Sequence, residues 1–277
     1  MKNHFFFAYV GNKRQEVEYI YKNINFKNIE TIVEPFCGSC ALSYYIWTQN
    51  RTKNYKYILN DLDSNLIELL RLVKNGDLKQ VEDDLNNIRE EILLYEDDMI
   101  KAKKIYVDYI KQNYFKGWLL ANKCHSMRAG IFPLRDFKRS FNEKKIDLSK
   151  SPIYEFLTTA DIEIYNEDAN KIIDKYDNKK TFIFLDPPYI ASCNQFYSTD
   201  TGENIMNIYE MLYYKGLKNF KCKILICHEN NWLFKILFKE YFDVENEYKK
   251  QYEGSIGRKG KPKKQTTHIC IKNFLKM

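Results

Sequence analysis

An apolar run that ends in Asp-Pro-Pro-Tyr constrains the fold of this chain more than any other stretch. Residues 181–185 favour a buried strand, and Asp186, Pro187, Pro188 and Tyr189 follow it directly. In open α/β sheets, ligands bind beyond the carboxyl ends of the strands, so this edge presents a carboxylate to a ligand. The two prolines fix two φ angles and remove two donors, which leaves a stiff, acceptor-rich edge. A simple strand-to-turn junction with a solvated Asp is the alternative.

Three further strand ends carry polar or small residues. Residues 31–33 form a short apolar strand that leads through a small-residue turn into a helix ending near Trp47. Such a turn lets the backbone approach a nucleotide-like ligand. A strand at 57–60 ends in Asp61, a position where doubly wound folds bind ribose hydroxyls, and a strand at 162–165 leads to Asp168. This alternation predicts an α/β fold.

The turn after the first of these strands also contains Cys37 and Cys40. Cys-x-x-Cys at a strand-to-helix turn is typical of thioredoxin-like redox sites, and this reading stays open as a rival. It leaves Asp61 and Asp186 without a role. Because no second Cys or His pair has ligand spacing, the sequence predicts no metal site.

Length and composition limit the class of protein. A chain of 277 residues with net charge +7 is long enough for one large α/β domain with an insertion, and the charge favours an anionic partner. No apolar run reaches the length of a transmembrane helix, and the first ten residues lack a signal-peptide pattern. We therefore expect an intracellular, cytoplasmic protein without membrane association.

Two segments are rich in basic residues. The first lies between Lys111 and Lys145, where aromatic residues are interleaved, and the second lies in the connection of a predicted C-terminal hairpin. Basic residues mixed with aromatics suit a surface that binds phosphates and bases. A small separate core with a solvated basic rim accounts for the aromatics equally well. We expect nucleic-acid contacts from Lys123, Arg128, Arg135, Lys138, Arg139, Arg258, Lys259 and Lys261.

Five motifs occur in one order along nearly the whole chain. They lie at 9–13, 33–38, 60–67, Asp168 and 186–189. In this order the chain resembles Dam-like, adenine-N6-specific DNA methyltransferases. The resemblance implies a Rossmann-like S-adenosylmethionine-dependent methyltransferase sheet with a mainly helical target-recognition insert. The catalytic domain would comprise residues 1–70 and 160–277, and the insert residues 71–159.

The resemblance also implies the reaction. A methyl group passes from S-adenosyl-L-methionine to the amino group of an adenine flipped out of double-stranded DNA. Asp186, Pro187, Pro188 and Tyr189 are the implied catalytic residues, with the Asp186 carboxylate and the Pro187 carbonyl accepting hydrogen bonds from the target amine. The implied cofactor-binding residues are Tyr9, Lys13, Glu34, Phe36, Gly38, Cys40, Asp61, Asp168 and Asp186. A companion restriction enzyme is a further partner that this kind of enzyme can have.

One position departs from the family pattern. The family usually has a second glycine two residues after Gly38, and here Cys40 stands in its place. A Cβ there could crowd the amino-acid part of the cofactor, so a DNA-binding relative with weak or no activity is one alternative. Because the basic segments do not distinguish duplex DNA from structured RNA, an RNA adenine methyltransferase is the other.

Overall fold

The computed structural model describes residues 3–9, 11–125, 141, 145–190, 202–242, 247–251 and 265–274. The chain divides into two compact units. The helical unit comprises Met1–Asn12 and Ser64–Ala160, and the sheet unit comprises Lys13–Asp63 and Asp161–Met277. No helix in the described ranges is both long and apolar enough to cross a membrane.

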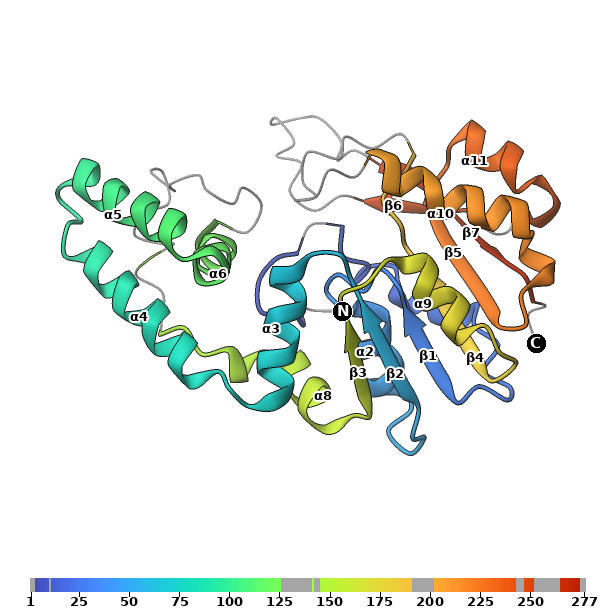
Figure 1. Cartoon of the computed structure of the whole chain (residues 1–277), viewed down its shortest axis with the longest axis horizontal. Helices are drawn as coiled ribbons and strands as arrows, with labels where there is room; N and C mark the ends of the chain where they lie inside the picture. The colour runs from blue at the N-terminus through green and yellow to red at the C-terminus, as the bar shows by residue number, and fades with distance from the viewer. Residues whose placement is uncertain are drawn as a thin grey trace. The chain divides into compact units, whose positions relative to one another are not determined.

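A seven-stranded sheet in the order β3-β2-β1-β4-β5-β7-β6 forms the sheet unit (Figure 1). Its strands are β1 (Thr31–Glu34), β2 (Lys56–Asn60), β3 (Ile162–Tyr165), β4 (Thr181–Leu185), β5 (Lys223–Glu229), β6 (Glu247–Gln251) and β7 (Gln265–Lys272). The first five strands in this order are parallel, and β7 runs antiparallel to both of its neighbours. The predicted α/β class with a Rossmann-like sheet is confirmed.

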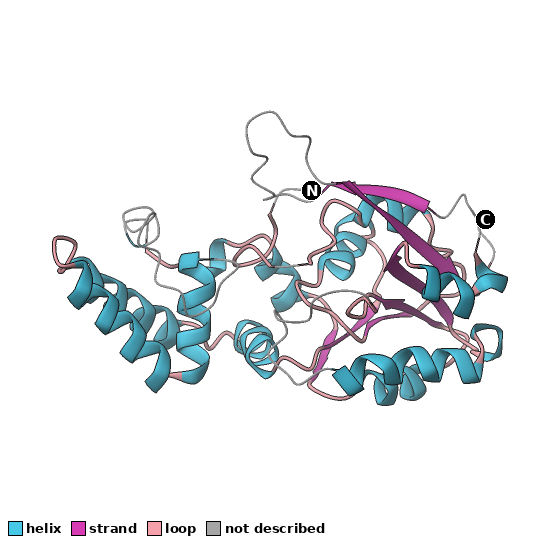
Figure 2. Cartoon of the chain, turned by 90° about the horizontal axis from the view of Figure 1, so that it is seen from above, coloured by secondary structure: helices cyan, strands magenta, loops and turns pink. Residues whose placement is uncertain are grey.

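Helices cover both faces of this sheet, as the view from above shows (Figure 2). The helices of the sheet unit are α1 (Val17–Lys22), α2 (Ala41–Gln49), α9 (Ala169–Tyr176), α10 (Gly202–Lys215) and α11 (Trp232–Leu237), with short 3₁₀ turns η3 (Leu217–Asn219) and η4 (Lys239–Tyr241). In Figure 1, α9 and α10 lie in front of the sheet and α2 lies behind it. This layering leaves the ends of the strands as the accessible edges.

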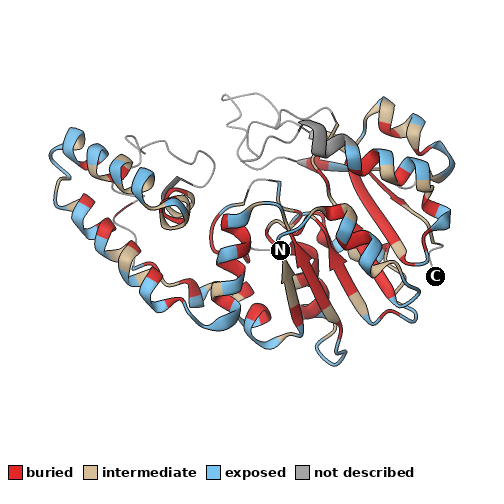
Figure 3. Ribbon diagram, viewed as in Figure 1, coloured by how far each residue is buried: buried red, intermediate tan, exposed pale blue. Residues whose placement is uncertain are grey.

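The central strand β4 is buried along its whole length (Figure 3). Its aromatic and β-branched residues favour a strand, and its side chains alternate between the two faces. Ile183 and Leu185 therefore share one face, where they pack with buried residues of α9 and α10. Phe182 and Phe184 are buried on the other face. Packing on both sides fixes where β4 ends, and so fixes the position of Asp186.

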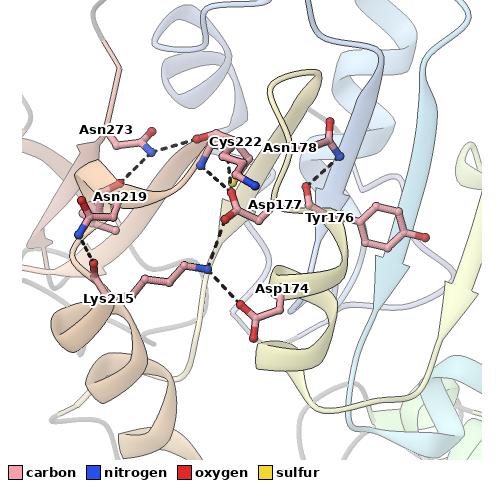
Figure 4. A network of polar contacts seen from close by, with 10 residues as sticks. Asp174, Tyr176, Asp177, Asn178, Lys215, Asn219, Cys222 and Asn273 are labelled. Carbon is pink, nitrogen blue, oxygen red and sulfur yellow. Dashed lines mark hydrogen bonds and ion pairs between the residues drawn. The ribbon is translucent and has the colours of Figure 1, made fainter.

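A polar network holds the amino ends of β4 and β5 (Figure 4). Asp177 accepts hydrogen bonds from the backbone N–H groups of Lys221 and Cys222 at 2.7 and 3.0 Å, and it pairs with Lys215 at 3.3 Å. Asn273, after β7, donates to the carbonyl of Cys222 at 3.0 Å. Because β4 and β5 are parallel, this network lies at the edge opposite to their carboxyl ends. We assign it a structural role.

All regular secondary structure in the described part of the helical unit is helical. They are α3 (Ser64–Asn75), α4 (Lys79–Leu93), α5 (Met99–Gln112), α6 (Tyr114–His125), η1 (Leu148–Lys150) and α8 (Ile153–Thr159). Gly117 lets α6 approach α5 closely, because a Cβ there would lie 2.7 Å from the Cα of Ile110. The Asn86 side chain exchanges hydrogen bonds of 2.8 and 3.0 Å with the backbone of Ile146. Phe141 is buried in this unit, so this aromatic residue belongs to its core.

Candidate active site

The carboxyl ends of four neighbouring parallel strands carry the residues that the motifs single out. In the order β3, β2, β1 and β4, the positions just beyond the strands hold Asp168, Asp61, the turn at Gly38, and Asp186. Strands lie about 4.8 Å apart, so this row spans roughly 14 Å. The structure therefore brings residues that are distant in sequence to one edge, as the motif order predicts.

Asp61 ties the ends of β1 and β2 together. Its Oδ2 accepts the backbone N–H of Gly38 at 3.0 Å, and its Oδ1 accepts that of Asp63 at 3.1 Å. Gly38 has a φ of 45°, a region that glycine adopts without strain. Burial raises the pKa of Asp61 to about 6, although the two N–H bonds lower it. The carboxylate thus holds the turn in shape and retains lone pairs for the hydroxyls of a ligand.

Asn60, the first residue of the motif at 60–67, is a residue of this edge to which the sequence analysis assigns no role. This fully buried side chain donates to the carbonyls of Pro35 and Glu167, each at 2.9 Å, and accepts the N–H of Glu167 at 2.9 Å. It joins the loops that follow β1 and β3 from its place at the end of β2. An amide at the last position of a buried strand is the signal that could have identified it.

The turn between β1 and α2 has an unusual backbone at Cys40. This residue adopts φ 53° and ψ 32°, the left-handed region that glycine adopts without strain. Its side chain exposes none of its surface, and its Sγ lies 3.7 Å from the carbonyl of Gly38. Burial raises the pKa of both Cys37 and Cys40, whereas a redox-active thiol needs a lowered pKa. Both cysteines are free thiols, and their environment is that of core residues.

Glu34 and Phe36 support this turn from within the sheet unit. The Glu34 carboxylate is buried and accepts the backbone N–H of Ser43 at 2.7 Å, near the start of α2. Burial raises the pKa of Glu34 to about 7, although the Ser43 bond lowers it. Phe36 is partly buried against the core beside α9 and α10. Glu34 therefore acts as a remote cap for α2.

A buried lysine holds the Asp-Pro-Pro-Tyr motif. Lys13 Nζ lies 2.6 Å from Asp186 Oδ2 and donates to the Tyr189 hydroxyl at 3.0 Å. The Lys13 side chain is 6% exposed and that of Asp186 is 17% exposed. Burial lowers the pKa of Lys13, but Asp186, Tyr189 and Glu16 together raise it well above its ordinary value. A permanent ammonium thus fixes one oxygen of the carboxylate, which leaves the group accessible at the strand edge.

The backbone of the same motif is fixed by two residues that sequence reasoning missed. Tyr209 on α10 donates its hydroxyl to the Pro188 carbonyl at 3.1 Å. His228 on β5 accepts the backbone N–H of Ile190 through Nε2 at 3.2 Å, and its Nδ1 lies 2.6 Å from the Glu229 carbonyl. Burial lowers the pKa of His228 to about 4, so its ring is neutral with the proton on Nδ1. No local sequence pattern marks these two residues.

The remaining predicted residues are held in different ways. Asp168 accepts the N–H of Asn170 at 2.8 Å as the N-cap of α9. Tyr9 belongs to the helical unit, where its ring lies 5.8 Å from that of Phe5, edge-on. Lys123 donates to the carbonyl of Phe6 at 3.0 Å within the same unit. The predicted nucleic-acid contacts Arg128, Arg135, Lys138, Arg139, Arg258, Lys259 and Lys261 lie outside the described residues.

The described ranges contain no group of three or more His, Cys, Asp and Glu side chains arranged to hold a metal ion.

Comparisons with known proteins identify the family. Residues 9–254 match the family described as D12 class N6 adenine-specific DNA methyltransferase. The Type II methyltransferase M.CviBI of Paramecium bursaria Chlorella virus NC1A is 25% identical over 252 residues, which cover 88% of this chain and 90% of that protein. The Type II methyltransferase M.MjaIII of Methanocaldococcus jannaschii is 23% identical over 207 residues, or 66% of this chain and 68% of that protein.

Among solved structures, the rRNA methyltransferase aviRa from Streptomyces viridochromogenes aligns with 96% of this chain and 87% of that chain, at 11% identity and a TM-score of 0.39. The family assignment rests on the sequence match and on the row of motif residues at the sheet edge. The resemblance that the motifs predict is confirmed: the chain belongs to the D12 class of N6 adenine-specific DNA methyltransferases.

Proposed function

We propose that this enzyme methylates a specific adenine in double-stranded DNA at the edge formed by Asp186, Pro187, Pro188 and Tyr189. The observation that carries the proposal is the arrangement of Asp186 at the end of the buried β4, where Lys13 holds Oδ2 at 2.6 Å. The carboxylate is rigid, charged and still partly exposed, which are the properties that a positioned hydrogen-bond acceptor needs.

We further propose that S-adenosyl-L-methionine binds along the row of strand ends from Asp168 to Asp186. The donor set fits a nucleoside with a charged tail, because two carboxylates and a glycine turn at a helix start follow one another along the edge. Asp61 is suited to ribose hydroxyls and Asp168 to an adenine amino group. When bound, this cofactor would supply an electrophilic methyl group, and its sulfur would keep the electron pair of the broken carbon–sulfur bond and leave as a neutral thioether.

Cys40 is compatible with the proposed S-adenosylmethionine site. Its buried side chain occupies the interior of the turn, so its Cβ and Sγ take no accessible surface at the edge. We infer that Cys40 tolerates the backbone conformation at a cost of about 1 kcal/mol and leaves the binding surface open.

The protein's part in the reaction is to prepare the target nitrogen. The lone pair of an adenine amino group is delocalised into the ring, which makes the nitrogen a poor nucleophile. Because Asp186 Oδ2 bonds to Lys13, we assign Asp186 Oδ1 and the Pro187 carbonyl as acceptors for the two amino protons. These bonds draw the nitrogen towards tetrahedral geometry and direct its lone pair.

The same groups complete the step. As the nitrogen gains a methyl group it becomes positively charged, and the carboxylate stabilises this charge as it develops. The nitrogen then loses one proton, for which the Asp186 carboxylate is the acceptor in contact. The Tyr189 ring, fixed through its hydroxyl by Lys13, stacks on the flipped base and offsets on the order of 1 to 3 kcal/mol of the flipping cost.

Strand direction supports binding of a polyanion at this edge. Because β7 is antiparallel to β5, the start of β7 pairs with the carboxyl end of β5 through His268 and Glu229. The connection from Gln251 to Gln265, which contains Arg258, Lys259 and Lys261, therefore leaves and re-enters the sheet at the catalytic edge. We propose that these residues bind phosphates.

We propose that the insert 71–159, which lies within the helical unit, provides target recognition. An enzyme with this substrate acts inside the cell or wherever the DNA lies. The two Type II relatives make a companion restriction enzyme a reasonable partner to seek. Expression of neighbouring coding sequences, followed by digestion of methylated and unmethylated DNA, tests for it.

The decisive experiment incubates the purified protein with genomic DNA and labelled S-adenosylmethionine, then sequences the product for N6-methyladenine. Asp186→Ala is expected to bind DNA and cofactor but to transfer no methyl groups, and turnover by this variant contradicts the mechanism. Calorimetry that detects no cofactor binding favours an inactive DNA-binding relative. Label found in structured RNA and not in DNA favours the RNA alternative.

A further inference from the structure

A second buried ion pair lies beside the catalytic motif. Glu16, which precedes α1, is 4% exposed, and its Oε1 lies 2.6 Å from Lys250 Nζ on β6. Its Oε2 accepts the Tyr248 hydroxyl at 2.6 Å and lies 3.4 Å from His268 Nδ1 on β7. One carboxylate thus joins the start of the sheet unit to two strands that follow the catalytic motif by more than fifty residues.

This pair is continuous with the contacts of the catalytic motif. His268 Nδ1 is also 3.4 Å from the Tyr189 hydroxyl, which accepts a hydrogen bond from Lys13. Lys13 and Glu16 are one turn apart, because the Glu16 N–H donates to the Lys13 carbonyl at 2.7 Å. The pairs Lys13–Asp186 and Lys250–Glu16 therefore belong to one buried cluster.

The cluster holds two ammonium groups and two carboxylates, so their formal charges cancel. Burial raises the pKa of Glu16, but Lys13, His268 and Lys250 lower it to well below its ordinary value, and Glu16 is ionised. Burial and the charge of Lys13 lower the pKa of Lys250. Lys250 is 8% exposed, so its charge depends on a protein carboxylate for compensation.

Other titratable groups surround the cluster. They are Tyr189, Tyr248 on β6, His268 and Cys270 on β7, and Cys227 and His228 on β5. Burial raises the pKa of Tyr189, Tyr248 and Cys227 well above their ordinary values and lowers that of His228 to about 4. These four groups are uncharged near neutral pH, which leaves Glu16 as the carboxylate in contact with Lys250.

We propose that Glu16 is a positioning residue for methyl transfer. The Glu16 carboxylate neutralises Lys250 and so prevents this second ammonium from pairing with Asp186. The Asp186 carboxylate then binds only Lys13 and the target amine. The inference rests on the proposed role of Asp186 as acceptor for that amine. It predicts that turnover depends on the balance of charge in the cluster and does not require Glu16 itself.

The test compares Glu16→Gln, Lys250→Gln and the double variant with wild type, in the full-length protein with duplex DNA. In Glu16→Gln, kcat is expected to fall on the order of 30-fold, equivalent to about 2 kcal/mol. KM for DNA and the dissociation constant of S-adenosylmethionine are expected to change less than about threefold, because the Glu16 side chain is buried and has almost no surface for a ligand to contact. The double variant, which restores the balance, is expected to recover kcat to within about threefold of wild type.

The split between kcat and KM, together with rescue by the double variant, is a readout that a purely structural role does not give. Glu30→Gln breaks an exposed Glu30–Lys180 pair of the same unit and is the matched control, with unchanged kcat and KM.

The outcomes are distinct. Wild-type kcat in Glu16→Gln, or a loss that the double variant does not relieve although circular dichroism shows a folded protein, overturns the inference. If Glu16→Gln does not fold, the inference is tested by Lys250→Gln, in which kcat is expected to fall, and by the double variant, in which it is expected to return to within about threefold of wild type. A wild-type protein that methylates no adenine in DNA refutes the proposed function itself, independently of these variants.

Discussion

Lys13→Met is the substitution that tests the catalytic site most directly. It keeps the volume of the side chain but removes the ammonium that lies 2.6 Å from Asp186 and 3.0 Å from the Tyr189 hydroxyl. Breaking a buried pair costs about 3 to 5 kcal/mol. Because the Asp186 side chain is 17% exposed, water can solvate the unpaired carboxylate and offset part of this cost. We therefore expect the free energy of unfolding to fall by about 3 kcal/mol, the lower end of the range. For a protein of this size, that corresponds to a fall in Tm of about 6 to 12 °C.

The rate of methyl transfer per folded protein should also fall, beyond any loss of activity caused by unfolding. Without Lys13, the carboxylate oxygen and the Tyr189 hydroxyl lose the ammonium that holds them, and misplacement of a reacting group by about 1 Å costs on the order of 100-fold in rate. The companion variant Lys13→Met/Asp186→Asn leaves no unpaired charge, so we expect it to regain most of the lost stability while methyl transfer stays absent.

Urea unfolding at one pH and transfer of labelled methyl groups to duplex DNA measure the two effects separately. A double variant no more stable than Lys13→Met would refute the electrostatic reasoning. Wild-type turnover in Lys13→Met would refute the proposed orientation of Asp186.

Three further predictions concern the rest of the edge. As pH falls from 6.5 to about 4, the unfolded chain protonates His228 before the native protein does, so this residue alone contributes a decrease of up to about 3 kcal/mol in the free energy of unfolding. This contribution is absent in His228→Gln, and unfolding of both proteins across this pH range measures the difference. Asp61→Asn is expected to weaken S-adenosylmethionine binding by about 10- to 100-fold in calorimetry, since hydrogen bonds to a charged group are lost; unchanged affinity contradicts the assignment. Changing Arg258, Lys259 and Lys261 to Ala should reduce the slope of log affinity for DNA against log salt by up to about 3 for every sequence, whereas an altered methylated sequence means that one of them contacts bases.

The sequence predicts the edge of the sheet well because its signals are local. Strand-like runs that lead to Asp61, Asp168 and Asp186 indicate both the strands and the edge that carries these residues, and the structure has all three beyond the carboxyl ends of parallel strands of one sheet. What the sequence does not predict is the support of this edge. Glu16 and Tyr248 are 232 residues apart, and no spacing in the chain indicates that their hydroxyl and carboxylate lie 2.6 Å apart.

The role of His228 is also not predictable from the sequence. A histidine at the end of an apolar strand is as consistent with a core residue as with a ligand, and its role depends on the N–H of Ile190, which is 38 positions away. Only the parallel register of β4 and β5, with Leu185 opposite Ile226, brings this ring to the backbone beyond the catalytic motif.

The edge of the sheet at which the basic connection at 252–264 begins and ends depends on strand direction. Its charge is evident from the sequence, but a basic loop at the opposite edge of the sheet would lie a full strand length, about 17 Å or more, from the target amine. Because β7 enters the sheet antiparallel to β5, with His268 beside Glu229, both ends of the connection lie at the edge where β4 presents Asp186. The proposed phosphate binding at the proposed catalytic edge therefore depends on the antiparallel direction of β7 as well as on the number of lysines.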